Sequence, residues 1–127
     1  MDKILAEISA GELIDKITIL EIKKEKIIDK EKLIEVDKEL VSLSKTLKKS
    51  INDESKISSF KKDLKNINLK LWDIEDGKRS AEKNNQFDEK FIQLARNVYK
   101  FNDERAKIKL AINNALGSNI KEVKSYE

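Results

Sequence analysis

Apolar residues recur at intervals of three and four along almost the whole chain, and this spacing places them on one face of an α-helix. The first run predicts a helix over residues 10–28. Ser9 and Glu12 have the spacing of a capping box at its start, with the Ser9 hydroxyl placed to accept from the amide of Glu12. Asp29 is placed to cap a second helix over 30–51. The apolar positions of these two runs are Leu13, Ile14, Ile17, Leu20, Ile27 and Ile28, then Leu33, Val36, Leu40, Leu43 and Leu47.

Two longer apolar runs follow after a cluster of turn residues at 52–55. They keep the heptad spacing of packed helices and predict helices over 55–83 and 87–116. Gly117 suits the left-handed conformation of a helix C-cap, and residues 118–127 form a polar tail. The seam positions are Ile57, Phe60, Leu64, Ile67, Leu71 and Ile74 in the third helix, and Phe91, Leu94, Val98, Phe101, Arg105, Ile108, Ile112 and Ala115 in the fourth.

These runs predict an all-α fold, because no segment shows the sustained alternation of a strand. We expect an antiparallel bundle of three to four helices with coiled-coil-like heptad packing, formed by a single domain over residues 1–127. The last two helices should make a long hairpin, with the first two packed along it. No proline enforces a break near Asp29, so the first two segments are either separate helices or one kinked helix.

Composition removes several classes of chemistry. The 127 residues are 40% charged and 39% hydrophobic, and they include no Cys, His or Pro. Disulfide scaffolds, Cys/His zinc sites and thiol or imidazole catalysis are therefore excluded, and no cofactor is expected. No apolar run is long enough to span a membrane, and the N-terminus lacks a signal-peptide core, so a cytoplasmic protein without membrane contact is expected.

The basic residues do not point to nucleic acid. Lysine and arginine total 27 against 24 acidic residues, for a net charge of +3, and the two signs interleave along the chain. Nucleic-acid binding would favour a basic stripe, so this partner is unlikely. Only Arg79, Arg96 and Arg105 are arginines. In a chain so rich in lysine, they mark positions where a planar, bidentate group is useful.

Several polar residues fall where the pattern calls for apolar ones. Glu21 and Lys24 project into the stripe of the first helix, and Arg105 occupies a seam position of the fourth. Asn102, Lys109 and Asn113 lie at the edge of that seam, and the third helix carries the line Asn68, Trp72, Glu75 and Arg79. Because buried charges are almost always paired, we expect an ion-pair layer that joins Glu21 to Arg105, or Glu75 to Arg79 or Arg105.

This layer has three interpretations. It fixes helix register, it lines a cavity that presents Arg79, Arg105 and Lys109 to an anion, or it is a partly solvated edge with no special role. Trp72 likewise either packs at a helix crossing or serves as an exposed anchor for a partner. The i, i+3 acid pairs Glu12/Asp15 and Asp73/Asp76 are possible Mg²⁺ ligands. Glu12 doubles as a capping residue and Lys16 lies beside it, so no metal site is predicted.

Four stretches together resemble a bacterial family known only as a domain of unknown function. They are Ile8–Lys23, Leu71–Asp76 with Arg79, Phe91–Tyr99 with Asn102–Ala106, and the C-terminal stretch with Gly117-Ser118 and Glu122–Tyr126. The resemblance implies no activity. It implies that the positions of interest are Glu12, Asp15, Lys16, Glu21, Trp72, Glu75, Arg79, Arg96, Tyr99, Asn102, Arg105 and Lys124-Ser125-Tyr126.

Two functions follow from the sequence. The favoured one is a non-catalytic interaction or adaptor module that binds a protein partner or a second copy of itself. The alternative is a helical bundle that binds, or acts on, a small anionic ligand through Arg and Lys electrostatics. Candidate ligand-binding residues are Glu21, Trp72, Glu75, Arg79, Arg96, Tyr99, Asn102 and Arg105.

Overall fold

The computed structural model describes residues 1–125 and shows four α-helices with no strand among them, which confirms the all-α helical bundle. The helices are α1 (Ala10–Lys26), α2 (Lys30–Ser50), α3 (Ser55–Lys83) and α4 (Glu89–Leu116). Tyr126 and the last residue of the tail lie outside the described residues.

Local capping residues set most of the helix ends. The Ser9 hydroxyl accepts from the amide of Glu12 at 3.1 Å, and the Asp29 carboxylate accepts from the amide of Glu31 at 2.9 Å. Because Asp29 starts a new helix, α1 ends at Lys26, two residues before the predicted end, and the first two segments are separate helices. Gly117 adopts the left-handed conformation expected of it, with φ 65°.

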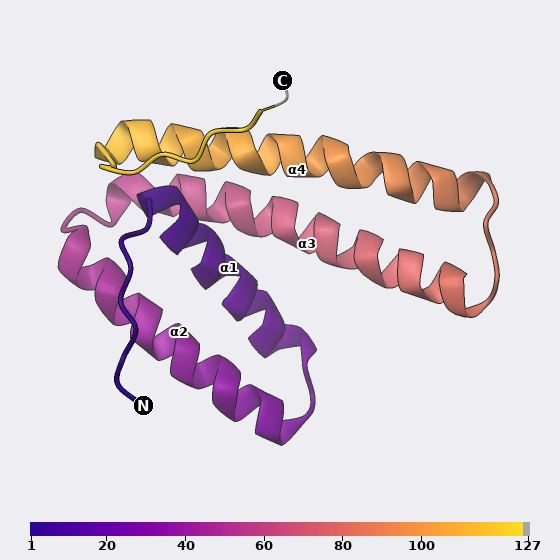
Figure 1. Ribbon diagram of the computed structural model, residues 1–127, viewed down its shortest axis with the longest axis horizontal. Coiled ribbons are helices and arrows are strands. Elements are labelled where there is room, and N and C mark those ends of the chain that lie inside the picture. The colour runs from indigo at the N-terminus through magenta and orange to yellow at the C-terminus, as the bar shows by residue number, and fades with distance from the viewer. Residues whose placement is uncertain (126–127) are drawn as a thin grey trace.

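The last two helices form a long antiparallel hairpin, and α1 crosses one half of it (Figure 1). Helix α1 packs against both α3 and α4, whereas α2 packs against α1 alone. The expected packing of both short helices along the hairpin therefore holds only for α1. We call residues 77–101, the half of the hairpin that projects beyond α1, the arm, and the remainder the body.

The core lies in the body, where α1, α3 and α4 meet. Ile14, Leu64 and Ile112 are fully buried there, and Ile57 packs with them. The seam residues of the arm are only half buried, because no third helix covers them. Those half-buried residues are Phe91, Leu94, Val98 and Phe101.

Candidate functional site

The centre of the body is a buried carboxylate. Asp15, in the middle of α1, is fully buried. Its Oδ1 accepts from Arg105 Nε at 2.9 Å, and its Oδ2 accepts from Nη2 of the same guanidinium, so the pair is bidentate. Asn68 of α3 donates through Nδ2 to the same Oδ1 at 2.9 Å, and also to the Thr18 hydroxyl at 2.9 Å. Three helices are thus joined through one carboxylate.

A second ion-pair group lies one turn further along α4. Lys109 Nζ donates to Glu12 at 2.7 Å and to Glu122 of the C-terminal tail at 3.1 Å. Burial lowers the pKa of Lys109, but the hydrogen bonds to these two carboxylates outweigh burial, and the net pKa is raised. The pKa of Glu122 falls to about 2, because Lys124 and Lys109 both stabilise its carboxylate. Lys109 and Glu122 are therefore both charged at neutral pH.

The N-terminal amides of α1 are also satisfied from within the chain. The amide of Ala10 donates to the Ser118 hydroxyl at 3.1 Å, and that of Gly11 donates to Asn113 Oδ1 at 2.7 Å. This docking requires glycine at position 11, since a Cβ there would lie 2.5 Å from the carbonyl oxygen of Lys109. The first turn of α1, α4 and the tail therefore form one interlocked unit.

An ion-pair layer exists, as expected, but its partners were predicted wrongly. Arg105 pairs with Asp15 rather than with Glu21. Glu21 instead pairs with Lys61 at 3.0 Å, and Glu75 pairs with Lys78 at 3.4 Å within its own helix. No buried side-chain nitrogen or oxygen among residues 1–125 lacks a hydrogen-bond partner. The layer is thus internally complete.

Of the remaining candidates, Asn102 contacts this layer. It lies at the boundary of arm and body and accepts from Arg105 Nη1 at 3.4 Å. Trp72 and Arg79 line a cavity of about 410 Å³ between α1 and α3, together with Glu75. Arg96 and Tyr99 are exposed on the arm. The eight candidates therefore do not converge on one site, and Arg105 does not line the cavity that contains Arg79.

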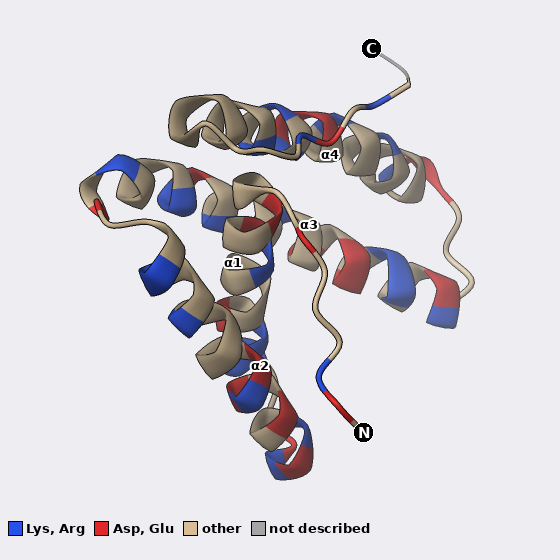
Figure 2. Ribbon diagram, turned by 60° about the vertical axis from the view of Figure 1, so that its left-hand side comes forward, with Lys and Arg blue, Asp and Glu red and all other residues tan. Residues whose placement is uncertain are grey.

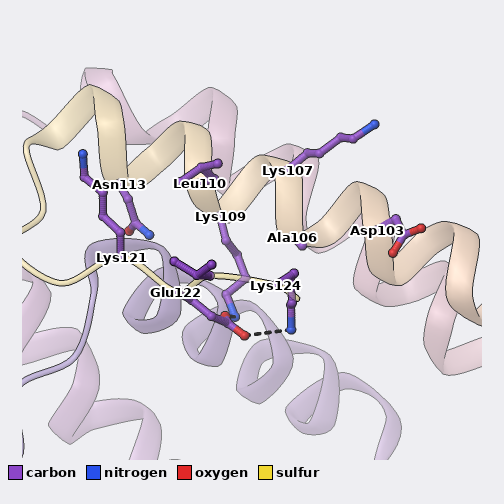
Figure 3. Close-up of a pocket in the computed structure, with 10 residues that line it drawn as sticks. Asp103, Ala106, Lys107, Lys109, Leu110, Asn113, Lys121, Glu122 and Lys124 are labelled. Atoms are coloured by element: carbon purple, nitrogen blue, oxygen red, sulfur yellow. Dashed lines mark hydrogen bonds and ion pairs between the residues drawn. The ribbon is translucent and has the colours of Figure 1, made fainter. Parts of the chain in front are cut away.

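Sequence reasoning placed Ser118 and Glu122 of the C-terminal tail in a motif, but it did not predict their contacts with α1 and α4. After Gly117 the chain reverses and runs back along α4 (Figure 1). A cavity of about 640 Å³ lies between the tail and α4. Figure 3 shows Lys109 reaching from α4 to the tail, where Glu122 meets Lys124. The left-handed Gly117 was the one signal for this reversal. The full lining is Asp103, Ala106, Lys107, Lys109, Leu110, Asn113, Lys121, Glu122, Val123 and Lys124.

Charges of both signs occur on every helix, as Figure 2 shows. In the described residues no three acidic side chains gather closely enough to hold a metal ion, so the Glu12/Asp15 and Asp73/Asp76 pairs remain isolated pairs. Asp15 and Glu12 instead serve as partners for Arg105 and Lys109. No helix in residues 1–125 has the length and hydropathy needed to cross a bilayer.

Comparison with protein families identifies the family of the chain. A model for a family of unknown function, DUF6165, matches residues 4–127. The chain belongs to this family. The match confirms the resemblance to a family of unknown function. The bacterial origin of the chain stays a prediction. No curated protein and no solved structure matches the chain significantly.

Proposed function

We propose that this chain is a non-catalytic protein-interaction module and that the arm is its docking surface. One observation carries the proposal: large apolar side chains are left exposed to solvent on the arm. Tyr99 is 58% exposed, Phe87 52% and Ile92 43%. Scattered apolar residues on a surface are ordinary, but these lie on one projecting element.

Helical geometry places two of these side chains, together with Arg96, on one stripe. Ile92, Arg96 and Tyr99 are separated by four and three residues, so they lie on the same face of α4. At 100° per residue that face points away from the seam with α3 that Leu94 and Val98 form. The stripe is therefore directed toward a partner rather than toward the hairpin.

The chemistry of the stripe is typical of a binding surface. Tyr and Arg are enriched among the residues that dominate binding energy at protein interfaces. Arg96 makes no ion pair with any other residue between 1 and 125. Its guanidinium is thus available to a carboxylate of a partner. An amphipathic helix with apolar residues at three- and four-residue intervals is the occupant that fits this face.

The saturated layer in the body favours this function over catalysis. The Asp15 carboxylate is engaged by Arg105 and Asn68, so the charges of this layer are already paired within the chain. The alternative of an anion site built on Arg79 and Arg105 is less well supported, because Arg105 does not line the cavity that Arg79 lines.

A photo-crosslinking experiment tests the proposal. A photoreactive amino acid at position 99 is compared with one at Glu104, an exposed position of α4 that faces away from the stripe. In the cells that produce the protein, illumination should give a discrete higher-mass adduct from position 99 and none from position 104. Adding Ile92→Glu should remove the adduct, because a charge in an apolar contact is costly.

The same experiment can overturn the proposal. Adducts of equal yield from both positions would mean that contact with the arm is non-specific. No adduct from position 99, at an expression level matched to the control, would remove the arm as a docking surface.

A further inference from the structure

The cavity between the C-terminal tail and α4 is a second feature, separate from the stripe formed by Ile92, Arg96 and Tyr99. Glu122 fastens the tail over α4 through Lys109, at 3.1 Å, and Ser118 fastens its other end to the first turn of α1. Because the tail is held at both places, the space of about 640 Å³ beneath it belongs to the folded structure. Sites for small molecules are typically about 300–1,000 Å³, so this volume is in the usual range.

The walls of this cavity are largely apolar. Ala106 and Leu110 line it from α4, and Val123 lines it from the tail. Leu110 is 42% exposed although it lines the cavity. The aliphatic stems of the lining lysines add further apolar surface. A purely hydrophilic ion would leave these walls without a partner.

The rim of the cavity carries an excess of positive charge. Four lysines line it against two acids, Asp103 and Glu122. Lys109 and Lys124 are already paired with Glu122, at 3.1 and 2.7 Å. Lys107 and Lys121 form no ion pair with any residue of the described chain. Figure 3 shows Lys121 extending from the tail toward α4, whereas Lys107 extends away from the tail. The ammonium group of Lys121 is therefore the one left to set the potential beside the tail.

We propose that this cavity binds a small amphipathic anion, with a carboxylate at the lysine rim and an apolar body against Ala106, Leu110 and Val123. The apolar wall selects the body of the ligand, and Lys121 selects the sign of its head group. Both parts of the ligand are needed, because neither a screened ion pair nor a small apolar contact alone gives stable binding. The binding requires no partner protein and does not depend on the arm.

Three probes separate these contributions in the purified full chain. Decanoate has both the apolar body and the negative head, decyltrimethylammonium has a similar body with the opposite charge, and inorganic phosphate has charge without a body. We expect saturable binding of decanoate alone, below its micellar concentration, seen by calorimetry and by chemical-shift changes at Ala106 and Leu110. Raising the salt concentration should weaken it, because the rim charges are exposed.

Charge-reversal variants locate the site. The variant Lys121→Glu should weaken decanoate binding by about fivefold, since an exposed pair is worth up to about 1 kcal/mol. Lys100→Glu is the matched control, because it makes the same change in net charge at an exposed lysine outside the cavity. The control should bind decanoate as the wild type does.

Four results would overturn the proposal. They are equal binding of decyltrimethylammonium, equal binding of phosphate, the same loss of affinity in the control variant, and no saturable decanoate binding. Sedimentation of the chain with vesicles of anionic lipid, without binding of free decanoate, would assign the lysines to a membrane surface instead.

Discussion

The body and the arm of this molecule use polar residues in opposite ways. In the body, Asp15 of α1 forms ion pairs with Arg105 and Lys109 of α4. On the arm, Arg96 and Tyr99 sit on an exposed face that the rest of the chain leaves uncovered. Both regions contain polar residues that interrupt the apolar pattern, but only the polar residues of the arm are accessible to another molecule.

The difference shows why a polar residue on an apolar face is ambiguous in a sequence. A buried charge is tolerated when partners from neighbouring elements surround it, and it then fixes their register. The same residue type on an uncovered helix pair makes no such contacts. What separates the two cases is whether a third helix covers the hairpin, and α1 covers only the half that contains Arg105.

The largest expected effect comes from breaking the central ion pair of the body. Arg105→Met should lower the free energy of unfolding by roughly 3–5 kcal/mol, because it leaves the fully buried Asp15 carboxylate without its main partner. Urea denaturation followed by circular dichroism measures the change.

The double variant Asp15→Leu/Arg105→Met provides the control. It removes both charges and should be more stable than Arg105→Met alone, while Asn68 keeps its hydrogen bond to Thr18 at 2.9 Å. If the single and double variants lose the same stability, the buried charge is not the cause, and the contrast between body and arm loses its physical basis.

Much of this architecture follows from local patterns in the sequence. Ser9, Asp29 and Gly117 begin or end helices where their own chemistry requires it. The heptad spacing after the turn residues at 52–55 predicted the observed bounds of α3. That Arg105 must find a partner was also predictable, since charges are rarely buried alone.

The partner of Arg105 was not predictable, for a geometric reason. Asp15 and Glu21 both lie on α1, 9 Å apart along the axis at about 1.5 Å per residue, and only the crossing point of α1 on the hairpin decides which one meets Arg105. Gly11 sets that crossing by allowing close approach to Lys109, and glycine within a helix gives no such indication in sequence. The contacts of the tail depend on the same crossing.

Two glycines sharpen the comparison, one in each region. Gly11→Ala would place a Cβ 2.5 Å from the backbone oxygen of Lys109, and it should cost about 1–3 kcal/mol because backbone must move. Gly77→Ala would meet Leu94 Cδ1 at 3.2 Å in the arm. That side chain can rotate, so the gain in helix propensity of up to about 1 kcal/mol should offset the contact. Thermal unfolding of the two variants side by side tests this, and equal losses would contradict it.

A smaller effect concerns acid and the C-terminal tail. The pKa of Glu122 is lowered from 4.5 to about 2 by Lys124 and Lys109, so its stabilising contribution is full above pH 4.5 and is lost as pH falls toward 2. The stability difference between wild type and Glu122→Gln should therefore shrink across that range. Because the side chain is 44% exposed, solvent screening should limit the difference to about 1 kcal/mol or less. A difference that does not change between pH 6 and pH 2.5 would show that the ion pair does not hold the tail.

The smallest effect on stability is expected in the arm. Tyr99→Ser should change the free energy of unfolding by no more than about 0.5 kcal/mol, because a side chain that is 58% exposed loses little burial when it is shortened. Urea denaturation of this variant beside Arg105→Met measures both regions on one scale. A loss above about 2 kcal/mol would mean that Tyr99 packs within the fold, and the arm would then be structural in the same sense as the body. A second photoreactive residue can be placed at position 92 in the Tyr99→Ser variant. If this variant keeps its stability but loses the adduct from position 92, binding and folding are separate on this helix face.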